Sequence, residues 1–301
     1  MPRKERQMFK FNCPIRVCPV TMEPTKILKT LGLITACLAI MSLPAFSGAI
    51  LDPAGFNANT LAANDDGSTG AVPLGFSVNF FGANSTTVFV NNNGNVTFTN
   101  SLSQYTPNGL STGVGQPIIA PYFADVDTRG TAPPSGLVTY GTATVNGFAA
   151  FGVEWPNVGY FGEHTNKLAD FELILIDRAD TGAGNFDIEF NYNTVQWETG
   201  DASGGINGLG GTSSAVGYSN GVSGSGNVFF QLPGSLVNGA LIDGGVDALI
   251  SHDLNSTVLG RYDFSVRNGV VVSGVPEPGT FILLGLGLGA VALGKLRRKA
   301  V

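Results

Sequence analysis

Two groups of aspartates have residue types and spacings that could bind a divalent cation. Asp125 and Asp127 flank one valine, so an extended chain places their carboxylates on the same side, about 7 Å apart. Asp177, Asp180 and Asp187 bracket a glycine-rich turn that could add backbone carbonyls. Such hard oxygen ligands are the ones that Ca²⁺ prefers. The sequence therefore makes these five aspartates candidate calcium ligands, and no cofactor other than calcium is expected.

A second interpretation of the same aspartates stays open. Neither group has the spacing of an EF-hand loop, and the sequence contains no glycine-rich nonapeptide calcium repeat. Aspartates in hairpin turns also accept hydrogen bonds from nearby backbone N–H groups, and Arg129 and Arg178 could neutralise the carboxylates. On this interpretation both groups are structural.

Residues suited to catalysis are scarce. Ser203 lies in a Gly-Asp-Ala-Ser-Gly-Gly run that is superficially like a serine-protease motif, but an alanine interrupts it and the chain has only two histidines. Paired carboxylates could hydrolyse glycosides, and four glutamates neighbour aromatic residues: Glu154, Glu172, Glu189 and Glu198. Glu172 and Glu189 also fit the polar faces of strands. We therefore expect no enzyme.

Three aromatic residues could recognise a ligand without catalysis. Trp155, Tyr160 and Trp197 could form a platform on which a sugar stacks. In a chain with 20 phenylalanines the alternative is that they belong to a core or a sheet face. A calcium-assisted carbohydrate-binding protein thus remains the alternative function.

The elements that must position these residues are strands. Residues 186–192 alternate apolar and polar side chains, which predicts an antiparallel strand with one wet face that includes Glu189 and Asn191. A bulge near Asn193 would keep Val195 inward. Residues 171–176 predict a central strand covered on both faces and joined to residue 186 by a hairpin, and residues 198–213 predict a long surface loop. Further strands are expected at 76–81, 87–90, 96–98, 117–123, 137–141, 148–155, 215–219, 228–232 and 262–267.

The sequence patterns at both ends of the chain predict that the protein is exported. Lys26 and Lys29 precede an apolar run over residues 31–43 and the small residues Ser47-Gly48-Ala49, which is the pattern of a secretory signal peptide. Cleavage is expected after Ala49, with Ala45 as the alternative. We expect residues 1–21 to be a misassigned or disordered extension, because translation could start at Met1, Met8 or Met22. The signal peptide would then occupy residues 22–49.

The C-terminal segment combines three features in order. Pro276-Glu277-Pro278 precedes an uncharged apolar run over residues 281–294, and a basic cluster that includes Arg297 and Arg298 follows. A helix of the apolar run would be about 21 Å long, which is marginal for a hydrocarbon core of about 30 Å. We expect the basic cluster to stay on the cytoplasmic side, with the preceding chain outside the membrane.

Excluding both ends changes the composition. All three cysteines precede residue 50, so residues 50–272 contain neither a disulfide nor a thiolate metal site. Five basic residues against 19 acidic ones give residues 50–272 a formal charge of −14, compared with −6 for the whole chain. Such a negative charge repels phosphate backbones, so no nucleic-acid partner is expected.

Residues 275–301 resemble the PEP-CTERM sorting signal through Pro276-Glu277-Pro278, the apolar stretch and the basic terminus. That family implies recognition by a membrane-embedded exosortase in Gram-negative, often biofilm-forming bacteria. Residues 117–232 resemble the NIDO domain of extracellular proteins, and the upstream residues 76–98 look like the start of the same module. The residues that carry this resemblance are 119–130, 153–160, 171–178, 186–192, 196–200 and 217–221. The NIDO resemblance implies cell–matrix adhesion without catalysis.

We therefore expect an all-β, antiparallel, sandwich-like single domain over residues 50–272, with a helix in the signal peptide and another in the sorting segment. The expected protein is exported, lies at the cell surface or in the extracellular matrix, and is anchored transiently or permanently through residues 281–294. Its expected partners are an exosortase and components of the matrix or exopolysaccharide.

Overall fold

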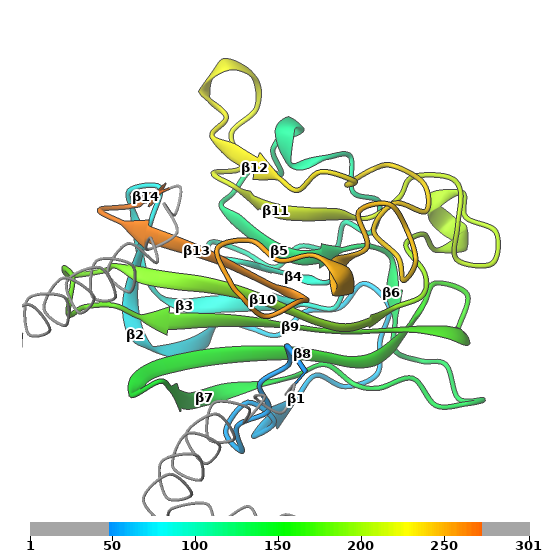
Figure 1. The fold of residues 1–301 in the computed structure, drawn as a ribbon, viewed down its shortest axis with the longest axis horizontal. Coiled ribbons are helices and arrows are strands. Elements are labelled where there is room, and N and C mark those ends of the chain that lie inside the picture. The colour runs from blue at the N-terminus through cyan, green and yellow to red at the C-terminus, as the bar shows by residue number, and fades with distance from the viewer. Residues whose placement is uncertain (1–47, 273–301) are drawn as a thin grey trace, which may run out of the picture. The chain divides into compact units, whose positions relative to one another are not determined.

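A computed structural model describes residues 48–272 of the chain. The expected extension over residues 1–21, residues 22–47 of the expected signal peptide, the sorting segment and the two terminal helices lie outside the described residues. The described part is built from β-strands and short 3₁₀ turns, and all of its strand pairings within the two sheets are antiparallel, so the predicted all-β fold is confirmed (Figure 1). Its 3₁₀ turns are η1 (Leu110–Thr112), η2 (Asp201–Ser203), η3 (Gly224–Gly226) and η4 (Leu249–Ser251).

The strands form two sheets, which we name the first and the second sheet. The first sheet runs in the order β1 (Asn59–Thr60), β7 (Thr139–Val145), β8 (Phe148–Tyr160), β9 (His164–Asp177), β10 (Phe186–Val195), β13 (Arg261–Arg267) and β14 (Val270–Val272), while β6 (Val126–Asp127) pairs with β8. The second sheet runs in the order β12 (Phe229–Gln231), β11 (Ala215–Ser219), β5 (Ile118–Phe123), β4 (Asn95–Thr97), β3 (Ala83–Asn91) and β2 (Val72–Phe80).

One large core lies between the two sheets. Side chains from β2, β3 and β5 meet side chains from β8, β9 and β10 in a single cluster of buried apolar residues. Aromatic rings dominate this cluster, and Trp155 stacks on Phe171 with ring centroids 5.0 Å apart. Because residues 50–272 contain no cysteine, burial of this apolar surface is the main stabilising contribution to the fold.

The hairpin of β9 and β10 agrees with its sequence pattern. The two strands pair from Asp177↔Phe186 to Ala169↔Val195, with a register shift between Tyr192 and Thr194. This is the predicted bulge, and it keeps Val195 fully buried. Ile174 and Ile176 pack into a second apolar cluster on the opposite face of β9, so the expected central strand is covered on both sides.

Two expectations about exposure held only in part, because each segment also contains buried polar residues. Glu189 and Asn191 lie on the face of β10 predicted to be wet, yet both are buried, because the segment that contains Ala49 and Leu51 interacts with this face of the sheet. The expected surface loop at residues 198–213 begins with a buried Glu198, whose Oε1 accepts a hydrogen bond from Ser213 Oγ at 3.0 Å. The polar sequences of these two segments gave no sign of this burial, because the buried residues are satisfied by hydrogen bonds and not by apolar contacts.

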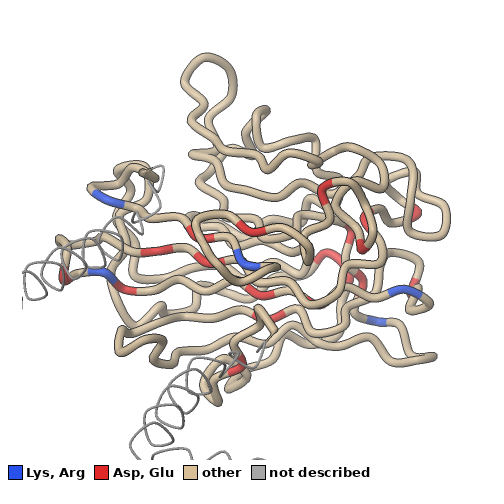
Figure 2. The backbone as a smooth tube through the Cα atoms, viewed as in Figure 1, with Lys and Arg blue, Asp and Glu red and all other residues tan. Residues whose placement is uncertain are grey.

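The basic residues of the described part all have partners within the molecule, while acidic residues outnumber them (Figure 2). Four arginines form ion pairs with carboxylates, and Lys167 donates to the Asn207 carbonyl at 2.7 Å. The ion pairs join Arg129 to Asp65 and Asp127, Arg178 to Asp180 and Asp187, Arg261 to Glu189, and Arg267 to Asp187. Within residues 48–272 no helix is long and apolar enough to cross a membrane.

Candidate functional site

Three aspartates converge at one place, and we call them the acidic site: Asp65, Asp66 and Asp125. Asp65 and Asp66 lie in the loop between β1 and β2, and Asp125 directly precedes β6. One carboxylate oxygen from each lies within 4.8 Å of the other two. Among the described residues this is the one group of three acidic, histidine or cysteine side chains close enough to share a metal ion.

A turn rich in asparagine, between β3 and β4, holds these segments together. Asn93 donates from Nδ2 to Asp66 Oδ1 at 2.8 Å, and its Oδ1 accepts the Val126 N–H at 2.9 Å. Asn92 reaches the same two segments, since its Nδ2 donates to the carbonyls of Asp65 and Val126. Both asparagines are buried, so their side chains act as fixed connectors between the acidic loop and β6.

The turn itself needs a glycine. Gly94 has φ of 69°, and a Cβ at this position would lie 1.7 Å from the Tyr122 carbonyl oxygen. Its backbone therefore approaches β5 more closely than any residue with a side chain could. The close approach lets Gly94 accept the Tyr122 N–H at 3.1 Å, which fixes the turn against the strand that leads to Asp125.

Asp125 is the buried member of the acidic site. Its exposed fraction is 1%, and its Oδ1 has no hydrogen-bond partner. Its Oδ2 accepts a hydrogen bond from Ser203 Oγ at 3.4 Å. Burial raises the pKa of Asp125 to about 7, and repulsion from Asp65 and Asp66 adds to that effect. An unpartnered oxygen in this position lacks a positive charge to compensate its burial.

Asp65 shares the same excess of negative charge. Burial raises its pKa to about 6, repulsion from Asp66 and Asp127 raises it further, and Arg129 opposes the shift. Asp65 Oδ2 forms an ion pair with Arg129 Nη2 at 3.2 Å, and its Oδ1 is buried without a partner. The acidic site thus contains two unpartnered carboxylate oxygens, one on Asp65 and one on Asp125.

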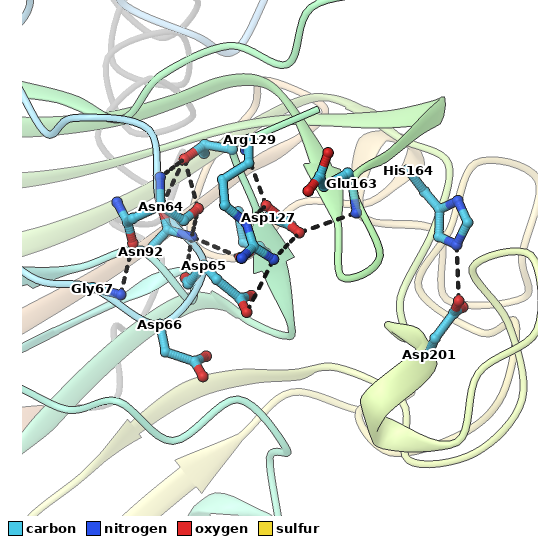
Figure 3. Close-up of polar contacts among 12 residues, drawn as sticks. Asn64, Asp65, Asp66, Gly67, Asn92, Asp127, Arg129, Glu163, His164 and Asp201 are labelled. Atoms are coloured by element: carbon cyan, nitrogen blue, oxygen red, sulfur yellow. Dashed lines mark hydrogen bonds and ion pairs between the residues drawn. The ribbon is translucent and has the colours of Figure 1, made fainter. Parts of the chain in front are cut away.

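Asp127, by contrast, is fully committed to other partners (Figure 3). Its Oδ1 accepts from Arg129 N and Nε at 3.0 and 2.8 Å, and its Oδ2 accepts from Arg129 Nη2 and from the Glu163 N–H at 2.7 and 3.1 Å. Burial pushes the pKa of Asp127 upward, but these hydrogen bonds hold it below its usual value. The side chain therefore holds Arg129 beside Asp65, and Asp127 is not one of the three converging carboxylates.

The geometry of the acidic site suits a calcium ion. Oxygen ligands lie about 2.4 Å from Ca²⁺, so two of them on one ion are at most about 4.8 Å apart. The three carboxylates meet this condition, and the Ser203 hydroxyl beside Asp125 is a further oxygen. Water would complete a coordination shell of about six to eight oxygens.

The second predicted group of aspartates has a different geometry. Asp177 Oδ1 accepts the Ala179 N–H at 3.0 Å, which is an Asx turn. Arg178 bonds Asp180 at 3.0 Å and Asp187 at 2.7 Å. These contacts are those of the structural interpretation: arginines pair with Asp180 and Asp187, and Asp177 accepts a backbone hydrogen bond.

Sequence reasoning missed Asp65 and Asp66. They lie about 60 residues before Asp125, and no local spacing connects them to it. The signal that could have found them is the Asn64-Asp65-Asp66-Gly67 turn, in which the Asn64 side-chain oxygen accepts the Gly67 N–H at 2.6 Å. Adjacent carboxylates in such a turn project toward one region and repel each other unless a cation lies between them.

The other candidate residues are placed as follows. The rings of Trp155, Tyr160 and Trp197 are buried in the core, which is the alternative placement given for them, and they do not form an exposed sugar platform. Ser203 Oγ is bonded to Thr106 Oγ1 at 2.8 Å as well as to Asp125. His164 Nε2 bonds Asp201 Oδ2 at 2.8 Å (Figure 3).

Comparison with known proteins gives relatives for most of the chain. Alpha-tectorin of Homo sapiens and alpha-tectorin of Mus musculus are each 32% identical to it over 249 residues, which cover 73% of this chain and 11% of theirs. Alpha-tectorin of Gallus gallus is 30% identical over 228 residues, which cover 67% of this chain and 10% of the relative. The chain thus spans about a tenth of the length of these relatives. No solved structure matches it.

Two family models match separate parts of the chain. The PEP-CTERM protein-sorting motif matches residues 274–299, and the nidogen-like domain matches residues 86–268. The sorting motif and the domain together support an exported protein of the cell surface or the extracellular space. The second match covers β4 to β13 and more than half of the sequence, and it agrees with the two-sheet fold. The chain belongs to the nidogen-like domain family.

Proposed function

We propose that the protein is a non-catalytic component of a biofilm or extracellular matrix that is sorted by an exosortase and contributes to cell–matrix adhesion. The nidogen-like domain and the sorting motif support the location, and the likeness to alpha-tectorin supports a matrix-type role. The negative charge of residues 50–272 fits an exported protein that stays soluble in the matrix.

The adhesion module binds Ca²⁺ at the acidic site as part of this function. One observation carries the assignment: the buried Asp125 has an unpartnered oxygen and lies within 4.8 Å of carboxylate oxygens from Asp65 and Asp66. A bound cation compensates these charges and joins the loop before β2 to the segment before β6. Extracellular calcium modules bind with Kd values on the order of 10⁻⁴ to 10⁻³ M, which is the affinity expected here.

Calorimetric titration and thermal unfolding of the exported protein test the calcium site. Ca²⁺ should bind with the affinity given above and raise the unfolding midpoint, and Asp125→Asn should abolish both effects. Asp253→Asn is the matched control, because Asp253 is exposed and lies outside the acidic site. If Asp125→Asn retained the full calcium effect, or if the unaltered protein showed none, the assignment would be wrong.

Adhesion is tested separately in the producing cells. Deletion of the gene should reduce the retention of cells in the matrix, and expression of the unaltered gene should restore it. The protein should fractionate with the surface or the matrix. Recovery of all of it from the cytosol with both termini intact would contradict the proposal, whatever the calcium titration gives.

Carbohydrate binding is the second candidate function. A hollow of about 320 Å³ is lined by residues that offer polar groups, including His164, Asn166, Asp201 and Asn207, next to the exposed Ile206. Side chains of this kind can bind sugar hydroxyl groups. A glycan array with and without EDTA tests it: sugar retention that is lost on Asn166→Ala supports a lectin-like role, and no retention removes it.

A further inference from the structure

A row of polar side chains crosses the first sheet on one face, and we call it the polar row: Thr139, Glu154, Glu172, Asn191 and Arg261. They lie directly opposite one another on β7, β8, β9, β10 and β13. Glu172 and Asn191 are fully buried. A charged row in this position needs internal partners, because water does not reach its centre.

Residues 49–52, which contain the expected cleavage site of the signal peptide, lie against the polar row. Leu51 N donates to Glu172 Oε2 at 3.0 Å, and the Ala49 carbonyl accepts from Arg261 Nη2 at 2.9 Å. Ile50 and Asp52 line, together with Glu154 and Asp170, a cavity of about 170 Å³. Ile50 and Asp52 therefore border a partly open cavity beside the polar row.

Two carboxylates, one in the cavity and one beside it, lack a counterion. Glu154 lines the cavity and Glu172 accepts the Leu51 N–H next to it, and Oε1 of each is buried without a hydrogen-bond partner. Arg261, the basic member of the row, is already bonded to Glu189 at 3.0 Å and to Asn191 Oδ1 at 2.9 Å. Asp52 and Asp170 add further negative charge to the cavity.

The pKa values of the two glutamates reflect the same lack of positive charge. Burial raises the pKa of Glu172 to about 8, although hydrogen bonds from Leu51 and Asn191 oppose the shift, and Glu154 and Glu189 raise it further. Burial also raises the pKa of Glu154 to about 7, with repulsion from Asp52 adding to it. A positive charge in the cavity would reverse both shifts.

Signal-peptide removal can supply that charge. Cleavage after Ala49 converts the neutral peptide nitrogen of Ile50 into an ammonium group with three N–H donors. This nitrogen is within about 4 Å of Leu51 N, because neighbouring Cα atoms are about 3.8 Å apart. Since Leu51 N already contacts Glu172, the new amino group is formed at the edge of the cavity.

We propose that the mature amino terminus at Ile50 binds in this cavity as the counterion of Glu154 and Glu172, so that processing of the signal peptide completes the fold. Cleavage removes the Ala49 carbonyl from Arg261, whose guanidinium keeps its bonds to Glu189 and Asn191. An uncleaved chain has no ammonium at this position and leaves both glutamates without a counterion. The stability of the domain is thereby linked to its export.

The first test is the mass of the exported protein and its N-terminal sequence. The proposal requires Ile50 as the first residue. An amino terminus at Phe46, which follows from cleavage after Ala45, would overturn it, and so would any other first residue. This result is independent of the calcium site and of adhesion.

The second test compares two forms of the exported protein, one that begins at Ile50 and one that begins at Gly48. The Ile50 form should unfold at a temperature at least about 3 °C higher at pH 8, which for a domain of this size corresponds to about 1 kcal/mol. The Glu154→Gln/Glu172→Gln double variant should remove the difference, and the control Asp253→Asn should preserve it. Equal unfolding temperatures for the two forms would overturn the proposal.

A measurement on the amino group keeps the test decisive if the double variant does not fold. The α-amine of the Ile50 form should be acetylated at least tenfold more slowly at pH 8 than that of the Gly48 form, because it is buried and charged. Equal rates would overturn the proposal. A calcium effect could also overturn it. If Ca²⁺ stabilised the Gly48 form as much as the free Ile50 terminus stabilises the mature form, and if this effect required Glu154 and Glu172, the cavity would be a metal site.

Discussion

Trp155 in β8 donates its indole N–H to the main-chain carbonyl of Asn92 at 3.0 Å. The bond joins the core of the first sheet to the asparagine turn of the second sheet. Asn92 in turn contacts Asp65 and Val126 through its side chain. The position of the acidic site therefore depends on a buried tryptophan that does not belong to the site.

Trp155→Phe should lower the free energy of unfolding by about 1–3 kcal/mol, because the buried Asn92 carbonyl keeps only the Gly94 N–H as its donor and the smaller ring leaves space in the core. Urea unfolding measures the change. Tyr140→Phe is the control, since Tyr140 is only partly buried and packs at the margin of the core. A loss for Trp155→Phe no larger than that of the control would contradict the role of this bond.

Gly94→Ala should be among the most damaging single substitutions in the turn. The new Cβ would lie 1.7 Å from the Tyr122 carbonyl oxygen, at a φ of 69°. We expect a loss of at least about 3 kcal/mol in unfolding free energy, together with weaker Ca²⁺ binding. Gly147→Ala is the control that separates backbone strain from steric clash. Gly147 has φ of 86°, but nothing lies within 4 Å of the added Cβ. Similar losses for the two variants would show that the close approach is unimportant.

Arg129→Ala should destabilise the protein by removing the counterion of a buried carboxylate. Asp127 has an exposed side-chain fraction of 0%, whereas that of Arg129 is 41%. Because solvent screens the exposed guanidinium, we expect a loss of about 1–2 kcal/mol. Lys167→Ala is the matched control, since its ammonium contacts only a loop carbonyl. Thermal and urea unfolding should rank the two variants in this order.

Stability should fall with rising pH in a chain that retains residues before Ile50. The pKa of Glu172 is raised from 4.5 to about 8, so the folded form binds its proton more tightly than the unfolded form does. The stabilisation is complete below about pH 4.5 and is lost as the pH rises through about 8. The groups that face Glu172 are Glu154, Glu189 and Asn191 together with the Leu51 N–H. Urea unfolding of the Gly48 form from pH 5 to 8.5 measures this slope, and Glu172→Gln should make it less steep, while Glu154 and Asp125, whose pKa values are also raised, keep part of it.

Most strands of this domain could be predicted from the sequence, because the longer ones each carry a pattern of their own. Alternation over residues 186–192 identified β10, and the change of parity at Val195 identified the bulge that the structure contains. The dense run at 171–176 identified a central strand, because side chains on both of its faces are apolar. Local periodicity therefore identified eleven of the fourteen strands in residues 48–272 and most of their boundaries, whereas the short strands β1, β6 and β14 were not predicted.

The acidic site could be predicted only in part. Asp125 was a candidate ligand from its spacing to Asp127, but Asp65 and Asp66 reach it through contacts made by Asn92 and Asn93. The polar row was missed for a similar reason, since a polar strand face normally indicates solvent and here residues 49–52 cover it. Contacts between distant polar residues leave no periodic pattern in a sequence.

All five basic side chains of residues 48–272 are bound within the molecule, and this affects how closely copies of the domain can pack. Each arginine or lysine is held by a carboxylate or a carbonyl of the same molecule, while acidic residues remain in excess. Two such domains therefore repel each other over about one Debye length, roughly 8 Å at physiological ionic strength. Dense packing of many copies outside a cell then depends on dissolved salt, and brackish or mineral-rich surroundings would draw them closer than fresh water would.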